Sequence, residues 1–166
     1  MTKLTQQPLV TYSQVQTREK LRADTRLKRN KLSNDFQQQA SETLTQQLIQ
    51  IPAVRSAKTL ALYLSNDGEL NPKPFIEWCW LHKKEIVLPL IHPFSKGNLL
   101  FLKYQPDSLL KNNKYNIPEP VLDVTNIVLV NDIDVIFTPL VAFDCEGRRL
   151  GMGLSLIHIS EPTRQA

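Results

Sequence analysis

The chain has 166 residues, a length that suits one domain with a substantial core. Hydrophobic residues make up 42% and charged residues 22% of the sequence, which argues against a disordered chain and against a membrane protein. The formal net charge of +4 is compatible with anionic partners such as nucleotides, polyglutamates or nucleic acid, but it selects none of them.

The N-terminal part predicts two helices. Residues 1–16 show no clear periodicity and are expected to form a loose leader. Residues 18–31 contain no Gly or Pro and predict a helix. Four arginines of this helix fall within an arc of roughly 80°: Arg18, Arg22, Arg26 and Arg29. A second helix is expected to begin at a cap formed by Ser33 or Asn34 and to end before Pro52.

The remaining chain alternates short apolar runs with turns and one helix. Residues 59–65 and 85–91 predict buried strands, and residues 71–84 between them predict a helix. This βαβ unit favours a parallel sheet. Further elements are expected as strands at 98–104 and 133–143, with an ordered loop at 111–120 between them.

The loop "SNDGEL" follows the predicted strand at 59–65, at the edge where α/β sheets bind ligands. One interpretation is an ordinary turn of Asn66, Asp67 and Gly68 that leaves Glu69 in solvent. The other is that Glu69 contacts a ligand.

The loop "FDCEGRRLGMG" follows the predicted strand at 133–143 and combines three glycines with Arg148 and Arg149. Glycines let backbone N–H groups approach phosphate oxygens, and guanidinium groups neutralise phosphoryl charge. The loop lacks the GxxxxGK[ST] pattern of a Walker A motif. It is therefore either a phosphate site or a surface turn with two solvated arginines.

Two other features bear on the class of protein. The arginine face of the first helix is either solvated or in contact with phosphate or nucleic acid. Cys79 and Cys145 lack metal-site spacing, and no apolar run approaches the ~18 residues of a membrane span. A reducing, cytoplasmic location with no membrane partner is expected.

Several motifs in this order resemble the 5-formyltetrahydrofolate cyclo-ligase family, also called methenyltetrahydrofolate synthetase. They are "REKLR", "YLSNDGEL", "EIVLPLI", "YNIPEP" and "IDVIFTPLVAFDCEGRRLGMG", and the last is the most specific. The resemblance spans about residues 17 to 153. It implies a three-layer, Rossmann-like α/β fold with a mostly parallel sheet and N-terminal helices, incomplete at the C-terminus.

The resemblance also implies an activity. The family closes the ring of 5-formyltetrahydrofolate to give 5,10-methenyltetrahydrofolate, with ATP and Mg²⁺ as cofactors and release of ADP and phosphate. The formyl oxygen attacks the γ-phosphate, and N10 then closes on the activated carbon. The implied partner is 5-formyltetrahydrofolate, with or without a polyglutamate tail. The protein itself is expected to be a monomer that binds no nucleic acid.

Residue by residue, the resemblance assigns ATP contacts, with Arg149 also in a catalytic role. The ATP-binding positions are Arg18, Arg22, Gly147, Arg148, Arg149, Leu150, Gly151, Met152 and Gly153. Glu69 is expected to bind the folate, and Tyr115 to pack against its pterin ring. The family's magnesium-binding aspartate has no counterpart here, so no metal ligand is assigned.

The C-terminal segment departs from the family pattern. The family's loop continues as a GGYYDR-type sequence, whereas "LSLIHISEPTR" here resembles one reading frame of a sequencing-library adapter. The expected division is a leader at 1–16, a partial cyclo-ligase domain at 17–153 and a non-native tail at 154–166. The chain as written is expected to be inactive.

Two other function classes remain open from the residues alone. A basic nucleic-acid-binding module could use the same arginine helix and would show steeply salt-dependent binding without ATP affinity. A phosphosugar or CoA enzyme on a related fold could also place a glycine loop after a strand.

Overall fold

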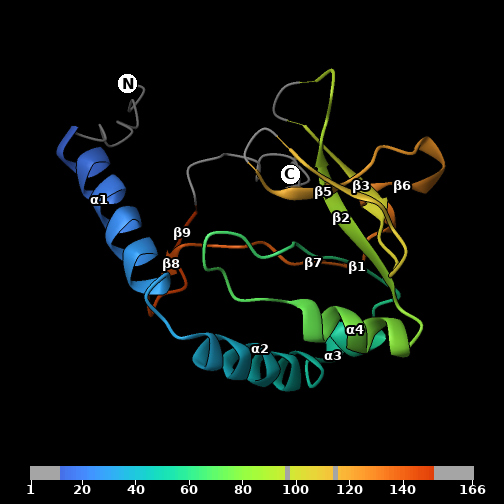
Figure 1. Ribbon diagram of the computed structural model, residues 1–166, viewed down its shortest axis with the longest axis horizontal. Coiled ribbons are helices and arrows are strands. Elements are labelled where there is room, and N and C mark those ends of the chain that lie inside the picture. Colours follow the sequence, from blue (N-terminus) through green and yellow to red (C-terminus); the bar gives the residue numbers. More distant parts are fainter. Residues whose placement is uncertain (1–11, 96–97, 114–115, 152–166) are drawn as a thin grey trace, which may run out of the picture.

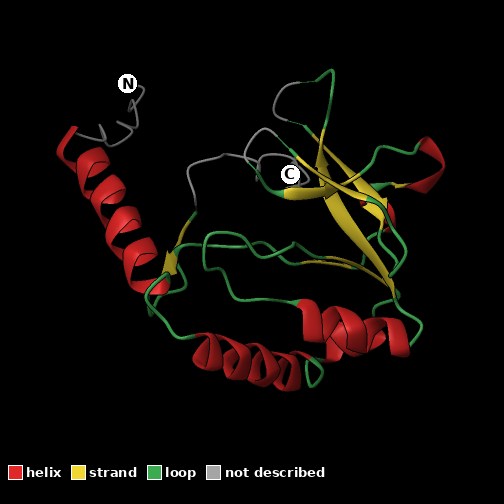
Figure 2. Cartoon of the chain, viewed as in Figure 1, coloured by secondary structure: helices red, strands yellow, loops and turns green. Residues whose placement is uncertain are grey.

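The computed structural model describes residues 12–95, 98–113 and 116–151. Figures 1 and 2 show a twisted sheet with helices gathered below it and one long helix standing apart. The helices are α1 (Tyr12–Arg29), α2 (Asn34–Leu48), α3 (Pro52–Ser56) and α4 (Lys73–Leu81). None of the helices in these ranges is long and apolar enough to cross a membrane.

The boundaries of the helices follow from local sequence. Ser33 caps α2, because its Oγ accepts a hydrogen bond from the backbone N–H of Phe36 at 3.2 Å. Helix α2 ends at Leu48, and Pro52 begins the short helix α3, which the sequence did not predict. Helix α1 begins at Tyr12, so residues 12–16 of the predicted leader belong to this helix. Residues 1–11 lie outside the described ranges.

The central sheet has five strands in the order β6, β3, β2, β1, β7. The strands are β1 (Thr59–Ala61), β2 (Glu85–Ile91), β3 (Leu99–Lys103), β6 (Ile127–Val128) and β7 (Val135–Ile136). Strand β1 is parallel to β2 and β7, while β3 is antiparallel to both β2 and β6. Only β3 therefore runs against the other strands of this sheet, which confirms the predicted mostly parallel α/β fold and its βαβ unit.

Both faces of the sheet bury apolar side chains. Along β2, Ile86 and Leu88 pack with Phe75 of α4 in the larger cluster, whereas Val87 packs with Phe101 in a second cluster. Successive side chains of a strand point to opposite faces, so these clusters lie on the two sides of the sheet. The continuous apolar run "EIVLPLI" is the sequence signature of such a strand.

Besides the strand predicted at 59–65, which is limited to β1 (Thr59–Ala61), two predicted segments differ from the structure. The strand predicted at 133–143 is divided into β7 and β8 (Ala142–Phe143), because Pro139 between them has no N–H to donate to a ladder. The loop predicted at 111–120 contains β4 (Leu110–Asn112) and β5 (Pro118–Pro120), which pair antiparallel. Two 3-10 turns, Val124–Asn126 and Val130–Asp132, flank β6.

The two cysteines differ in accessibility, and both are free. Cys79 is buried in the larger core cluster, and this burial raises the pKa of its thiol to about 12. Because the thiolate is the reactive form, we expect iodoacetamide at pH 8 to alkylate the exposed Cys145 and to spare Cys79 until the protein unfolds. Peptide mass spectrometry checks this; equal labelling of both thiols in the folded protein would contradict it.

Candidate functional site

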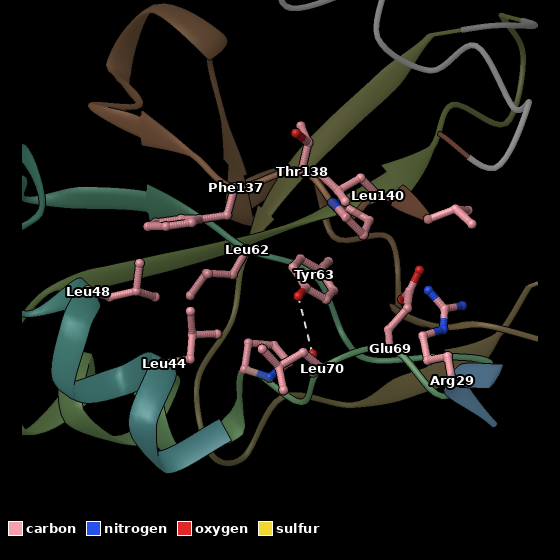
Figure 3. A pocket seen from close by; sticks show the side chains of 13 residues that line it. Arg29, Leu44, Leu48, Leu62, Tyr63, Glu69, Leu70, Phe137, Thr138 and Leu140 are labelled. Atoms are coloured by element: carbon pink, nitrogen blue, oxygen red, sulfur yellow. Dashed lines mark hydrogen bonds between the residues drawn. The ribbon is translucent and has the colours of Figure 1, made fainter. Parts of the chain in front are cut away.

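A pocket of about 310 Å³ opens where β1 and β7 end. Because these neighbouring strands are parallel, the segments that follow them leave the sheet at the same edge. Helix α2 supplies the opposite wall, as Figure 3 shows. The lining is mostly apolar and comprises Arg29, Leu44, Leu48, Leu62, Tyr63, Glu69, Leu70, Pro72, Phe137, Thr138, Pro139, Leu140 and Val141.

Glu69 lies in the wall of this pocket and is half-buried. Its Oε2 accepts a hydrogen bond from the backbone N–H of Asn66 at 3.1 Å. Burial raises the pKa of Glu69, and the Asn66 N–H and the charge of Arg29 offset this only in part. Figure 3 places Glu69 and Arg29 at the same end of the pocket. The site thus offers an acidic hydrogen-bond acceptor beside an apolar cavity.

The loop that carries Glu69 combines features of both sequence interpretations. A turn does form, since the N–H of Glu69 donates to the carbonyl oxygen of Asn66 at 3.0 Å. Asp67 and Gly68 adopt positive φ values of 50° and 72°. The positive φ of Gly68 favours glycine at this position, and a Cβ there would also meet the side-chain oxygen of Asn30. Glu69 is nevertheless not left in solvent, which contradicts the ordinary-turn interpretation for this residue.

The arginine face of α1 binds loops of the same chain. Arg26 Nε donates to Asp67 Oδ2 at 2.5 Å, and Arg29 Nη2 donates to the Asp67 carbonyl oxygen at 2.7 Å. The hydrogen bond from Arg26 lowers the pKa of Asp67. Arg22 Nε donates to the carbonyl oxygen of Gly151 at 2.8 Å. Three of the four arginines thus contact loops of the same chain, which neither sequence interpretation named, while Arg18 and Arg26 remain exposed.

The glycine-rich segment forms a hairpin in which β8 pairs with β9 (Arg149–Leu150). Gly147 has a φ of +77° at the turn, and its N–H donates to the carbonyl oxygen of Asp144. Asp144 Oδ1 accepts from the N–H groups of Glu146 and Arg148. These three amides are therefore engaged inside the turn, which was not expected of a loop that binds phosphate through backbone N–H groups.

The two adjacent arginines of the hairpin differ in their contacts. Arg148 pairs with Asp144 Oδ2 at 2.7 Å and with Glu146 Oε2 at 2.9 Å. Arg149 is exposed, and no hydrogen bond or ion pair from within the described part of the chain engages its guanidinium. Arg149 is thus the better placed of the two to meet an anionic ligand.

The structure brings some predicted site residues together. Along α1, Arg22 reaches Gly151, and about two turns later Arg29 lies beside Glu69 in the pocket lining. Tyr115, Met152, Gly153 and the predicted tail at 154–166 lie outside the described residues. Among the residues that are described, no group of three or more His, Cys, Asp or Glu side chains could hold a metal ion.

Several pocket residues were not expected from the sequence. Tyr63 is one, and its hydroxyl donates to the carbonyl oxygen of Leu70 at 3.2 Å; burial and the nearby charge of Glu69 raise the pKa of this phenol. Leu70, Phe137 and Thr138 are others. Their shared signal is position: each follows the end of β1 or β7, where parallel strands release the chain at the ligand-binding edge.

A mostly parallel sheet with an apolar, acid-bearing pocket at the carboxyl ends of two neighbouring strands is the arrangement that α/β proteins use to bind small molecules. The model of the 5-formyltetrahydrofolate cyclo-ligase family matches residues 14–155. The chain belongs to this family.

Relatives of this chain carry the same description. The 5-formyltetrahydrofolate cyclo-ligase of Haemophilus influenzae is 45% identical over 138 residues, which are 83% of this chain and 74% of that protein. Its counterpart from Escherichia coli K12 is 46% identical over 128 residues, 77% of this chain and 70% of the relative. The solved structure of Aquifex aeolicus 5,10-methenyltetrahydrofolate synthetase has a TM-score of 0.69 and 31% identity, covering 82% of this chain and 67% of that chain.

Proposed function

We propose that this protein converts 5-formyltetrahydrofolate to 5,10-methenyltetrahydrofolate in an ATP-dependent reaction that releases ADP and phosphate. The position of Glu69 in the pocket wall carries the proposal. A pterin ring has flat apolar faces and an edge of N–H donors. The pocket supplies matching apolar walls, among them Leu62 and Phe137, and one carboxylate. We assign the folate to this pocket, with Glu69 accepting from the pterin or N10 region and Tyr115 packing on the ring.

For ATP we propose the side of α1 that faces the hairpin. The assigned positions are Arg18, Arg22 and residues 147–153. ATP supplies the phosphoryl group that turns the formyl oxygen into a leaving group. Arg149, exposed on β9, is proposed to stabilise the charge that develops during phosphoryl transfer. Arg148 is proposed to contribute to ATP binding through the shape of the hairpin, which its ion pairs with Asp144 and Glu146 help to hold.

Residues can be assigned to ATP, but none can be assigned to Mg²⁺. No ready-made cluster of metal ligands exists among the described residues, so no residue is assigned to the ion and no step is derived through it. We propose Mg²⁺ only as a requirement of the reaction, arriving with the nucleotide.

The proposal extends to the tail of the substrate, the oligomeric state and the location. A net charge of +4 suits a folate with an anionic polyglutamate tail. We propose a monomer in a reducing, cytoplasmic compartment, where two free cysteines are expected to persist.

The test is a turnover assay on the full-length gene product. We expect formation of the methenyl product, followed by absorbance, only when both ATP and Mg²⁺ are present. Turnover at an equal rate without ATP would contradict phosphate activation of the formyl oxygen.

A further inference from the structure

One residue of the Glu69 loop, Asp67, receives an unusual number of contacts from α1. Arg26 Nε and Asn30 Nδ2 donate to its two carboxylate oxygens, Oδ2 and Oδ1, at 2.5 and 2.9 Å. Arg29 Nε and Nη2 donate to its carbonyl oxygen at 3.0 and 2.7 Å, and Nη2 also lies 3.4 Å from Oδ2. Both the side chain and the backbone of Asp67 are thus held by the last turn of the helix and by Asn30, the residue that follows it.

The conformation of this loop needs such support. Asp67 and Gly68 both lie in the left-handed region, which is costly for a residue with a Cβ unless its surroundings hold it there. The Asp67 side chain is only 22% exposed and that of Arg29 only 14%, so solvent screens their contacts little. Two residues further on, Glu69 enters the pocket wall.

The described apolar side chains of helix α1 bury little surface against the rest of the chain. Figure 1 shows it apart from α2, α3 and α4, and its Leu21 and Leu27 are 49% and 58% exposed. Polar contacts to Asp67 and, through Arg22, to Gly151 are therefore important in fixing it to the body. In return, the helix fixes the loop on which the acidic group of the pocket stands.

We propose that Asp67, held by Arg26, Arg29 and Asn30, is a positioning residue for folate recognition that sets the place of Glu69 in the pocket. Asp67 does not line the pocket, so it acts through the loop and not by touching the ligand. This inference rests on the proposed function, because it takes the pocket to be the folate site.

The test uses Arg26 and Asp67, since Arg29 lines the pocket and its replacement would mix two effects. Arg26→Ala removes one donor, and Asp67→Asn removes the charge while keeping a residue that tolerates positive φ. Arg26→Lys restores the charge. Lys28→Ala is the matched control, because Lys28 is an exposed cation of the same helix with no contact to Asp67 among the described residues.

We expect Arg26→Ala to weaken 5-formyltetrahydrofolate binding about 5-fold, the scale of a partly exposed ion pair, and Asp67→Asn to weaken it more. ATP affinity and the melting temperature should change little in Arg26→Ala, because Arg22 still ties α1 to Gly151 and Arg29 still contacts Asp67. Arg26→Lys should recover part of the loss, and Lys28→Ala should match wild type. Calorimetric titration with each ligand separately measures these affinities.

Glu69→Gln, titrated in parallel, separates the two proposals. If Glu69→Gln weakens folate binding but Arg26→Ala and Asp67→Asn do not, the positioning role is wrong while the folate site stands. If Arg26→Ala lowers folate and ATP affinity equally, the contacts serve general stability and the positioning role is again wrong. If Glu69→Gln has no effect on folate affinity, the assignment of the pocket itself fails, and the inference with it.

Discussion

Replacing Glu69 with glutamine is expected to weaken 5-formyltetrahydrofolate binding by about 10- to 100-fold, the range for losing a hydrogen bond to a charged group. ATP affinity should survive, because Glu69 lies in the pocket between β1, β7 and α2 and not on the hairpin. Separate titrations of the two ligands measure this. Loss of both affinities together would show instead that Glu69 holds the loop structure.

The pH dependence of folate binding has a defined sign. Burial raises the pKa of Glu69, whose charged and titratable neighbours are Arg29, Asp67 and Tyr63. Binding that needs the carboxylate is lost as the pH falls through this raised pKa, at a higher pH than for an ordinary glutamate. Binding to the Glu69→Gln variant should lack this transition. The same profile in both proteins would contradict the role of Glu69.

The raised pKa of Glu69 also predicts how Glu69→Gln changes stability, and this shows whether the variant is still folded. A carboxyl group with a higher pKa in the folded state than in the unfolded state makes the protein more stable as the pH falls through that value, and costs stability above it. Glutamine removes this cost at neutral pH, and its amide oxygen can still accept from the Asn66 N–H. The melting temperature of Glu69→Gln should therefore equal or exceed that of wild type, so that weaker binding cannot be attributed to unfolding.

The parts of the fold that the sequence predicted are those with a strong local signal. The apolar run at β2 and the helix α4 before it are contiguous in sequence, and both are present. The run at 133–143 has the same composition, but Pro139 interrupts its hydrogen bonding, so length and hydrophobicity overestimated the strand. The pairing of β4 with β5 was missed because both strands are only three residues long.

In the candidate site, too, features with a local sequence signal could be predicted and contacts between distant segments could not. The expected ligand edge made Glu69 a candidate beside the ordinary-turn interpretation, and the family resemblance favoured it as a folate contact. The partners of the arginines were not predictable, because Arg26 and Arg29 meet Asp67 across 41 and 38 residues of chain. Periodicity places side chains on one helix face, but it does not say which distant loop packs there. The hairpin turn had a local signal that was not used: Asp144 binds the backbone two and four residues ahead, and Gly147 supplies the positive φ.

In the full-length gene product, Arg149→Ala is expected to slow the reaction by about 10²-fold, on the scale of removing one donor to charge that develops in a transition state. The reason is the contrast within the hairpin: Arg148 is paired with two carboxylates, whereas the guanidinium of Arg149 has no such partner among the described residues. The loss should appear mainly in kcat, with little change in folate affinity, because Arg149 does not line the pocket. Steady-state kinetics with each substrate varied in turn measures this.

Two variants make the result interpretable. Arg149→Lys keeps the charge but loses the planar fork of donors, so it should recover only part of the rate. Arg55→Ala removes another exposed arginine, from α3, and should behave as wild type, which excludes a general effect of lowering the net charge. Phosphoryl transfer depends on positioning and charge stabilisation, so a group that serves it must act on the rate and not on binding alone. An unchanged rate in Arg149→Ala would mean that Arg149 is a solvated residue of a surface turn, and the charge-stabilising group would then have to lie elsewhere in the chain.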